Sequence, residues 1–315
     1  MERIVFLDRS TLNVALRRPR FAHEWREFAE TKPEEVVERL QGASITIANK
    51  VNLRDEHLAQ LPQLKFIAIA ATGVNNIDLE SCRKRAILVS NVRGYARHSV
   101  AEHVFMLMLA LRRKLTEYRG DVERGAWAMS SQFCLLNHTI RDLRRSTLGI
   151  VGYGSIGRAV EKLARAFGMQ VIVAEHKSAR MIRPGRMRFD EVLSASDILT
   201  LHVPLTAETK NLIGAPELAC MKPDALLINT GRGGLVDEQA LADALRARRL
   251  GGAGFDVLMN EPPREGNALL DANLPNLIVT PHNAWASREA LAILAEQLIA
   301  NLEAFVRHEP QNLVT

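Results

Sequence analysis

The sequence predicts an α/β protein with doubly wound parallel sheets. Short apolar runs alternate with helical patterns along nearly the whole chain, and this alternation is typical of parallel strands joined by helices. With 315 residues, of which 47% are apolar, the chain is long enough for two domains with sizeable cores. A glycine-rich turn at 152–157 lies between an apolar run and a helical pattern, as in the first strand–turn–helix unit of such a sheet.

The first hundred residues predict strands and helices in alternation. The expected strands are residues 3–8, 44–49, 66–70 and 87–90, and the expected helices are residues 33–40, 55–61 and 78–84. Thr31 is a possible cap for the first of these helices. Because ligands bind beyond the carboxyl ends of parallel strands, the loops at 49–52 and 72–75 are candidate ligand sites. In the second loop, Gly73 allows successive backbone N–H groups to face a carboxylate, with an ordinary strand-to-helix turn as the alternative.

Residues 100–115 predict a long helix that is apolar on most faces and therefore buried between other elements. His98 and His103 lie near its start, where we expect them to be packed polar groups rather than ligands. Residues 120–143 show no regular pattern. Long irregular segments in compact proteins are often functional, and we expect this one to contribute to a dimer interface.

The glycine turn follows an apolar strand at 148–151 and opens a helix at 155–167. In this spacing, Gly152 allows a tight turn, Gly154 lets the backbone approach a pyrophosphate, and Gly157 lets the helix pack closely on the strand. A diphosphate would accept hydrogen bonds from N–H groups at the helix N-terminus, where the helix dipole favours anions. A glycine turn in some other α/β protein is the alternative, but the flanking elements favour dinucleotide binding.

The next strand, at 171–174, ends at Glu175, about 20 residues beyond the glycines. An acid at this position would accept hydrogen bonds from the adenosine ribose and repel a 2′-phosphate. The sequence therefore favours NAD over NADP as the cofactor.

Three of the four remaining strands lead to a distinctive polar residue. The four strands are expected at 197–204, 225–230, 252–257 and 277–282, with a helix from Asp237 to about residue 250 and an amphipathic helix at 287–307. Arg232 follows the second of these strands, Asp256 lies at the end of the third with Glu261 just beyond it, and His282 ends the fourth. Since the carboxyl ends of parallel strands share one edge, these side chains can converge where a nicotinamide would lie.

The chemistry of three of these residues suits hydride transfer to a 2-keto acid. Arg232 offers a planar fork for a carboxylate or carbonyl oxygen. His282 can give or take the proton at the oxygen on C2, and Glu261 can orient the imidazole and stabilise its protonated form. Each has a structural alternative: Arg232 could cap strand carbonyls, Glu261 could be a solvated loop acid, and His282 could be a satisfied core histidine. Together, at the edge that the cofactor turn predicts, they indicate a catalytic site.

Composition argues against several other classes of protein. The formal charge of +5 and the pI of about 9.3 come from dispersed basic residues, and aromatic residues make up only 5%, so no nucleic-acid platform is expected. No apolar run approaches the ~20 residues needed to span a bilayer. The N-terminus runs straight into a strand, without the layout of a signal peptide. Three widely separated cysteines suggest neither a disulfide framework nor a metal site, and indicate a reducing, cytoplasmic environment.

At these residues the chain resembles the D-isomer-specific 2-hydroxyacid dehydrogenases, and the resemblance covers nearly the whole length. Seven segments match motifs of that family in the right order: 71–78, 99–103, 148–157, 197–209, 230–234, 255–263 and 280–285. They resemble, respectively, a substrate-carboxylate loop, the start of an interdomain helix, the cofactor turn, a segment bordering the cofactor, and the motifs that carry the catalytic Arg, Glu and His.

The resemblance implies two similar α/β domains. A flavodoxin-like substrate domain would comprise residues 1–99 and 287–315, with a Rossmann NAD-binding domain, residues 100–286, inserted in it. Family members are commonly homodimers built through the cofactor domain. The expected cofactor-binding residues are Gly152, Gly154, Ser155, Ile156, Gly157, Glu175, Val203, Pro204, Thr209, Thr230, Gly231, Arg232, Asp256, His282 and Ala284. The expected substrate-binding residues are Lys50, Val51, Gly73, Val74, Arg232, His282 and Trp285.

Within the family, the Thr-Gly-Val-Asn-Asn loop at 72–76, the segment 132–134 and Trp285 look most like glycerate dehydrogenases that reduce hydroxypyruvate. Two departures from the usual pattern are Glu175, where Asp is commoner, and the basic stretch 144–146 before the cofactor strand. The expected reaction is NAD-dependent reduction of hydroxypyruvate or glyoxylate. The alternatives are another D-2-hydroxy acid such as D-lactate or 3-phosphoglycerate, or a non-enzymatic NAD(H)-sensing protein.

Overall fold

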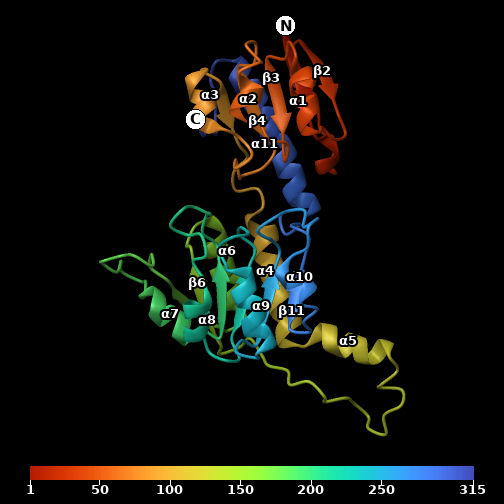
Figure 1. Ribbon diagram of the computed structural model, residues 1–315, viewed down its shortest axis with the longest axis vertical. Coiled ribbons are helices and arrows are strands. Elements are labelled where there is room, and N and C mark those ends of the chain that lie inside the picture. Colours follow the sequence, from red (N-terminus) through yellow and green to blue (C-terminus); the bar gives the residue numbers. More distant parts are fainter. The chain divides into compact units, whose positions relative to one another are not determined.

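The computed structural model describes residues 1–315 and divides into two units, each built on its own parallel sheet (Figure 1). The first unit comprises Met1–Ala96 and Ala286–Thr315, and the second comprises Arg97–Trp285. The predicted α/β class with two doubly wound parallel sheets is confirmed. No helix has both the length and the apolar composition needed to cross a membrane.

The first unit contains a five-stranded sheet in the order β2-β1-β3-β4-β5, with every neighbouring pair parallel. The strands are β1 (Glu2–Phe6), β2 (His23–Glu27), β3 (Ile45–Ala48), β4 (Phe66–Ile69) and β5 (Leu88–Ser90). This order is the flavodoxin-like one that the family resemblance implies. All residues of β3 and β4 are buried, as expected for central strands covered on both faces.

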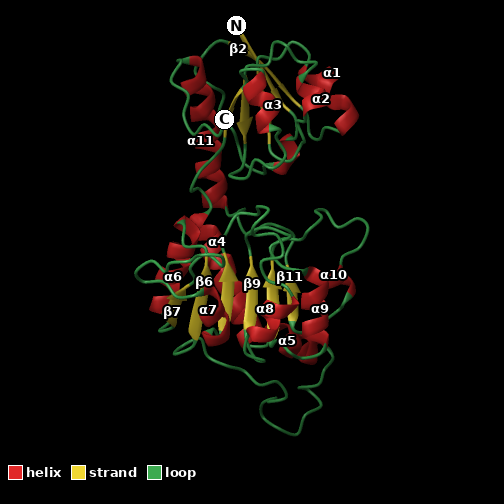
Figure 2. Ribbon diagram, turned by 60° about the vertical axis from the view of Figure 1, so that its left-hand side comes forward, coloured by secondary structure: helices red, strands yellow, loops and turns green.

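Short helices and one long helix cover this sheet (Figure 2). They are α1 (Val36–Leu40), α2 (Asp55–Leu58), α3 (Leu79–Lys84), α11 (Arg288–Val306) and two 3-10 turns, η1 (Arg9–Thr11) and η2 (Pro33–Glu35). Asp78 caps α3 by accepting from the Ser81 amide, and Ser287 caps α11 by accepting from the Ala290 amide. The expected cap at Thr31 is wrong, because its hydroxyl donates to the Leu7 carbonyl instead.

The second unit contains a six-stranded parallel sheet in the order β11-β10-β9-β8-β6-β7. The strands are β6 (Thr147–Val151), β7 (Gln170–Val173), β8 (Ile198–Leu201), β9 (Leu226–Asn229), β10 (Gly252–Phe255) and β11 (Leu277–Val279). A single parallel bridge from Ala174 to Met187 extends the sheet beyond β7. The chain therefore winds outward in both directions from β6, as in dinucleotide-binding sheets.

Seven helices belong to this unit, and those that contact the sheet lie on both of its faces (Figure 2). They are α4 (Arg97–Arg112), α5 (Leu115–Glu123), α6 (Ser155–Ala166), α7 (Phe189–Ala195), α8 (Ala215–Cys220), α9 (Glu238–Arg246) and α10 (Ala268–Asp271). Helix α4 is the buried apolar helix that the sequence predicts near 100–115, displaced by three residues. Helix α5 was not expected, because its segment carries too little apolar periodicity.

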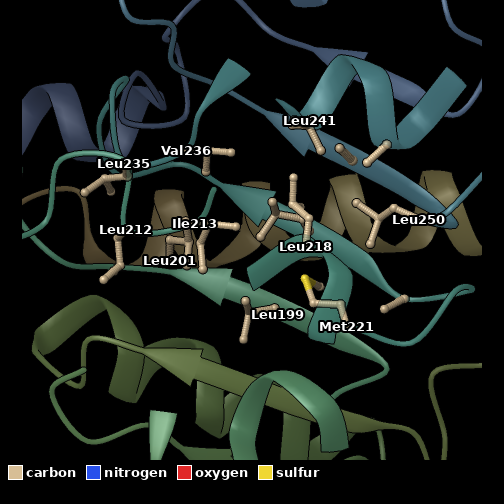
Figure 3. Packing of buried hydrophobic residues seen from close by; sticks show 14 of the residues in the cluster. Leu199, Leu201, Leu212, Ile213, Leu218, Met221, Leu235, Val236, Leu241 and Leu250 are labelled. Carbon is tan, nitrogen blue, oxygen red and sulfur yellow. The ribbon is translucent and has the colours of Figure 1, made fainter. Parts of the chain in front are cut away.

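Two cores lie on opposite faces of the second sheet. Ile198 belongs to the core with α4 and α6, whereas Leu199 and Leu201 belong to the core with α7, α8 and α9. This alternation follows from the two-residue period of a strand, and it explains the near-continuous apolar runs of β8 and β9. Figure 3 shows the second core, where Leu218 of α8 and Met221, the residue after that helix, pack near Leu199.

Candidate active site

The carboxyl ends of the parallel strands in the second unit share one edge of the sheet, and the strand order reverses next to β6. Ligands of such sheets bind at this reversal. The glycine turn follows β6, Glu175 follows β7, and Arg232, Asp256 and His282 follow β9, β10 and β11. The topology therefore brings the predicted cofactor and catalytic residues of this unit to the same edge.

The three glycines of the turn have different environments. Gly152 has φ +94°, and a Cβ there would lie 2.5 Å from the His202 carbonyl carbon. A Cβ on Gly157 would lie 2.3 Å from the Gly152 carbonyl oxygen. Gly154 is different: it is exposed, and a Cβ there would have no neighbour within 4 Å. The first and third glycines are needed for internal packing, while the second leaves open space at the N-terminus of α6.

This space fits the diphosphate of a dinucleotide. Gly154 is the N-cap residue of α6, no side chain caps the helix, and its first turn carries no acidic residue. The amides at Ser155 and Ile156 therefore face no competing carboxylate, and the helix dipole favours an anion here. At the end of β9, the hydroxyl of Thr230 is buried and has no hydrogen-bond partner within the chain.

The segment after β8 forms a closed turn. The Thr209 hydroxyl accepts from the Thr206 amide at 2.7 Å and donates to the Pro204 carbonyl at 2.7 Å. Thr209 is buried, whereas Pro204 is exposed and Val203 partly so. Among the expected cofactor residues of this segment, Thr209 therefore holds the turn in shape, and Val203 and Pro204 form its surface.

Glu175 lies at the end of β7, where the sequence places an acceptor for ribose hydroxyls, but its carboxylate already has partners. Arg183 donates to both carboxylate oxygens, at 2.6 and 2.5 Å, and the amides of His176 and Arg183 donate to them as well. The guanidinium of Arg183 is the main reason why the pKa of Glu175 lies well below its usual range. The ribose role of Glu175 stays a prediction.

His282 and Glu261 form a hydrogen-bonded pair. His282 Nδ1 lies 2.5 Å from Glu261 Oε2, and the other carboxylate oxygen accepts from the Leu258 amide at 2.7 Å. Because a carboxylate only accepts, Nδ1 must carry the proton and Nε2 faces outward from the pair. Both side chains are about one-third exposed or less, so a small molecule can reach the imidazole.

The backbone around His282 is held in an uncommon conformation. Its φ is +52°, which a non-glycine residue adopts at a cost that the surroundings must offset. Asp256, buried at the end of β10, supplies that support. Its carboxylate accepts from the Thr280 hydroxyl at 2.6 Å and from the Asn283 and Ala284 amides at 3.0 and 2.9 Å. The loop on either side of the imidazole is therefore fixed to β10.

His103 of α4 completes this support. Its Nε2 lies 2.9 Å from the Thr280 hydroxyl, which in turn donates to Asp256. Burial lowers the pKa of His103, while the charge of Asp256 opposes that effect. His103 is thus a packed polar group, as expected, and it contributes to the site through Thr280. The same expectation is wrong for His98, which is exposed.

Arg232 belongs to a loop that contacts the segment leading to Glu261. A Cβ on Gly233 would lie 1.8 Å from the Leu258 carbonyl oxygen, so only glycine permits this approach of the two backbones. The Asn229 side chain fixes the loop by donating to the Arg232 carbonyl at 2.9 Å and accepting from the Gly231 amide at 3.1 Å. The Arg232 guanidinium is partly exposed and donates to the Gly231 carbonyl at 2.7 Å.

The substrate-binding residues expected at 50–51 and 73–74 lie in the first unit, on loops after β3 and β4. The Asp8 carboxylate accepts from three successive amides, those of Asn49, Lys50 and Val51, at distances from 2.6 to 3.2 Å. These three amides are consequently taken and are not available to a ligand. The amides of Gly73 and Val74 donate no hydrogen bond within the chain.

Comparison with known proteins identifies the family. The model of the D-isomer specific 2-hydroxyacid dehydrogenase NAD-binding domain matches residues 105–284. The chain belongs to this family. It is 52% identical to a glycerate dehydrogenase from Methylorubrum extorquens over 314 residues, 99% of each chain. It is 38% identical to a glyoxylate reductase from Thermococcus litoralis, covering 89% of this chain and 85% of the relative.

Solved structures of other proteins have the same fold. A protein from Thermus thermophilus superimposes with a TM-score of 0.85 at 34% identity, covering 99% of this chain and 100% of that chain. The protein is therefore an oxidoreductase with an NAD-binding domain, as the sequence predicts.

Several residues that shape the site were not recognised in the sequence. Asp8, Arg183 and Gly233 each act on residues far away in the chain or in a loop of irregular backbone. Only Gly233 carried a signal, because a glycine next to a candidate catalytic arginine indicates a close backbone approach.

Proposed function

We propose that this dehydrogenase uses NADH to reduce hydroxypyruvate to D-glycerate and glyoxylate to glycolate. The observation that carries the proposal is the His282–Glu261 pair, which lies at the same sheet edge as Arg232 and the glycine turn. The similarity to a glycerate dehydrogenase over almost the full length, and to a glyoxylate reductase, supports small 2-keto acids as substrates.

The proposed chemistry combines a hydride and a proton. NADH, when bound, supplies the hydride that is added to C2 of the keto acid. His282 donates a proton from Nε2 to the oxygen on C2, which becomes the hydroxyl of the product. Glu261 holds Nδ1 through the 2.5 Å hydrogen bond, orients the ring and stabilises its protonated form. A proton from solvent then restores the imidazolium.

Arg232 and the first unit would bind the substrate. The Arg232 guanidinium suits a carboxylate or a polarised carbonyl, because its donors form a planar fork. The unpaired amides of Gly73 and Val74 suit the substrate carboxylate. Lys50 and Val51 would add side-chain contacts, since Asp8 occupies their amides. Trp285, which donates to the His282 carbonyl at 2.8 Å, would form an apolar wall next to the imidazole.

The cofactor would lie along the strand ends of the second unit. The diphosphate would bind at Gly154, Ser155 and Ile156, where α6 begins without a cap. The remaining contacts proposed from the family resemblance are Gly152, Gly157, Glu175, Val203, Pro204, Thr209, Thr230, Gly231, Asp256 and Ala284. The unpartnered hydroxyl of Thr230 is the feature of this set that most directly favours a ligand.

A panel of keto acids tests the proposed reaction. NADH oxidation would be followed with hydroxypyruvate, glyoxylate, pyruvate and 3-phosphohydroxypyruvate, and kcat/KM should be highest for hydroxypyruvate. The variant His282→Ala should lose about 100-fold or more in kcat, because a positioned general acid contributes at least that much. A preference for pyruvate or the phosphorylated acid would contradict the substrate assignment. NADH binding without turnover of any keto acid would favour a sensor.

We further propose that the chain forms a homodimer through α5 and the segment 124–142 that follows it. This segment extends away from the sheet of the second unit (Figures 1 and 2). It carries exposed apolar side chains, including Phe133 at 96%, Met129 at 80% and Leu136 at 77% exposure. Exposed apolar clusters of this kind mark protein interfaces, and a second copy of the same chain is the partner that family members most commonly use.

Light scattering after gel filtration tests this assembly. The wild-type chain should elute with twice the mass of one chain, and Phe133→Glu should shift the equilibrium toward one chain. Met181→Glu is the matched control, because Met181 is 84% exposed but lies outside the segment. A dimer that survives Phe133→Glu would place the interface elsewhere. We also propose a cytoplasmic location, which the three free cysteines favour.

A further inference from the structure

Glu175 differs from a freely available ribose acceptor in one respect: its hydrogen-bonding capacity is full. Oε1 accepts from the His176 amide at 2.8 Å and from Arg183 Nη2 at 2.5 Å. Oε2 accepts from the Arg183 amide at 3.2 Å and from Arg183 Nε at 2.6 Å. A carboxylate offers about four acceptor sites, so a ribose hydroxyl can bind here only in place of an existing donor.

The side chains around Glu175 also make the charge at this point positive, although the strand ends in an acid. The Glu175 side chain is 3% exposed, whereas that of Arg183 is 64% exposed. A second guanidinium, that of Arg186, lies 4.0 Å from the same carboxylate. One buried carboxylate therefore faces two guanidinium groups, and a ligand approaching from solvent meets the exposed positive charge of Arg183 first.

Arg186 links this cluster to the cofactor turn. Its guanidinium lies 5.8 Å from the ring centre of Tyr153, which stands between the first two glycines, and it donates to the Ala174 carbonyl at 3.1 Å. The two arginines therefore lie between the glycine turn and the end of β7. In a dinucleotide-binding sheet this is the place of the adenosine ribose.

We propose that this dehydrogenase also binds NADP(H), and that Arg183 determines the balance between the two cofactors by neutralising Glu175 and presenting its guanidinium to the 2′-phosphate. An acid alone at the end of β7 would repel the phosphate. Here the acid holds an arginine in place, and the planar donors of arginine match phosphate oxygens. The three N–H donors of Arg183 that Glu175 does not use remain for the phosphate.

Nucleotide fragments test the proposal independently of the proposed keto-acid reaction. Calorimetry would give dissociation constants for 2′,5′-ADP, which carries the 2′-phosphate, and for 5′-AMP, which does not. The wild-type chain should bind 2′,5′-ADP no more than about 10-fold more weakly than 5′-AMP. The ratio of interest is the dissociation constant for 2′,5′-ADP divided by that for 5′-AMP. Arg183→Gln should increase this ratio by about 10-fold or more, because a charge-assisted bidentate contact is lost.

Two further variants make the test specific. Arg180→Gln removes the same charge from the same segment, but Arg180 has no contact with Glu175, so the ratio should change by less than about threefold. Glu175→Gln keeps the guanidinium and removes the buried charge, so the ratio should fall in favour of 2′,5′-ADP. The same order should appear in kcat/KM for NADPH and NADH. A wild-type ratio above about 10, or equal ratios in Arg183→Gln and Arg180→Gln, would overturn the proposal.

Discussion

Gly154 should tolerate a methyl group in the protein without cofactor but not in the cofactor complex. The environment of a Cβ at this position is open, with no heavy atom within 4 Å, and its backbone is extended at φ −86°. The substitution Gly154→Ala therefore meets no steric barrier in the free protein. Its cost in stability comes only from a poorer N-cap residue and should be at most about 1 kcal/mol.

The cost in cofactor affinity should be larger. If the diphosphate lies against the Gly154 backbone, the methyl group occupies space that the ligand needs. Overpacking of this kind costs about 1–3 kcal/mol, which corresponds to an increase in the dissociation constant for NADH of about 5- to 150-fold. In contrast, Gly157→Ala places its Cβ 2.3 Å from a backbone oxygen and should destabilise the free protein itself, by about 2–3 kcal/mol.

Thermal unfolding without cofactor and NADH titration by fluorescence separate these effects. Gly157→Ala should lower the midpoint of unfolding of the second unit by about 5–10 °C, and Gly154→Ala by less than about 3 °C. Gly214→Ala is the matched control, because Gly214 is also an extended N-cap residue, of α8, outside the glycine turn. Should Gly154→Ala bind NADH as tightly as the wild type, the diphosphate does not approach this residue and the assignment of the turn is wrong.

Three further predictions concern single polar residues. Asp8→Asn should raise KM for the keto acid by about 10-fold with a smaller change in kcat, because three amides of the 49–51 loop lose a charged acceptor; steady-state kinetics separates the two constants. Burial lowers the pKa of His202 in the folded chain to about 4. As the pH falls, the His202 imidazole is therefore protonated in the unfolded chain before it is protonated in the folded chain. The free energy of unfolding should then drop between pH 6.5 and about pH 4, by up to about 3 kcal/mol, and urea unfolding of His202→Gln should show a smaller drop. Glu261→Gln should lower kcat about 100-fold, since the imidazole loses its charged partner, while circular dichroism stays unchanged.

The elements with strong apolar runs could be predicted from the sequence, since burial on both faces leaves a plain signal. The strand–turn–helix unit around the glycines was expected at 148–174 and is found as β6, α6 and β7. Strand β2 could not be recognised, because its residues His-Glu-Trp-Arg-Glu contain no apolar run. It is an edge strand that pairs only with β1 and is mostly exposed, so its sequence carries charges instead of apolar residues.

The candidate site was predictable where a residue directly follows a strand, because the shared edge of a parallel sheet then fixes its place. Arg232 and His282 are of this kind. Contacts that depend on loop conformation were not predictable. Arg183 reaches Glu175 across eight residues of irregular backbone, and Asp8 reaches the amides of a loop more than forty residues later. No periodicity encodes such contacts, since they follow from tertiary structure alone.

The acids that follow the strands divide into two groups with different roles in the site. Asp8, Glu175 and Asp256 are buried, and each accepts hydrogen bonds from at least two backbone amides of a following or neighbouring loop. Glu261 is about one-third exposed and is the acid that contacts His282. A carboxylate that satisfies buried amides is costly to redirect to a ligand, because the amides would lose their acceptors. The buried acids therefore fix the loops, and exposed partners such as Arg183 and the His282 imidazole are left to meet the ligands. On this argument, substitution of a buried acid should affect binding through loop position, whereas substitution of Glu261 should act on the chemical step.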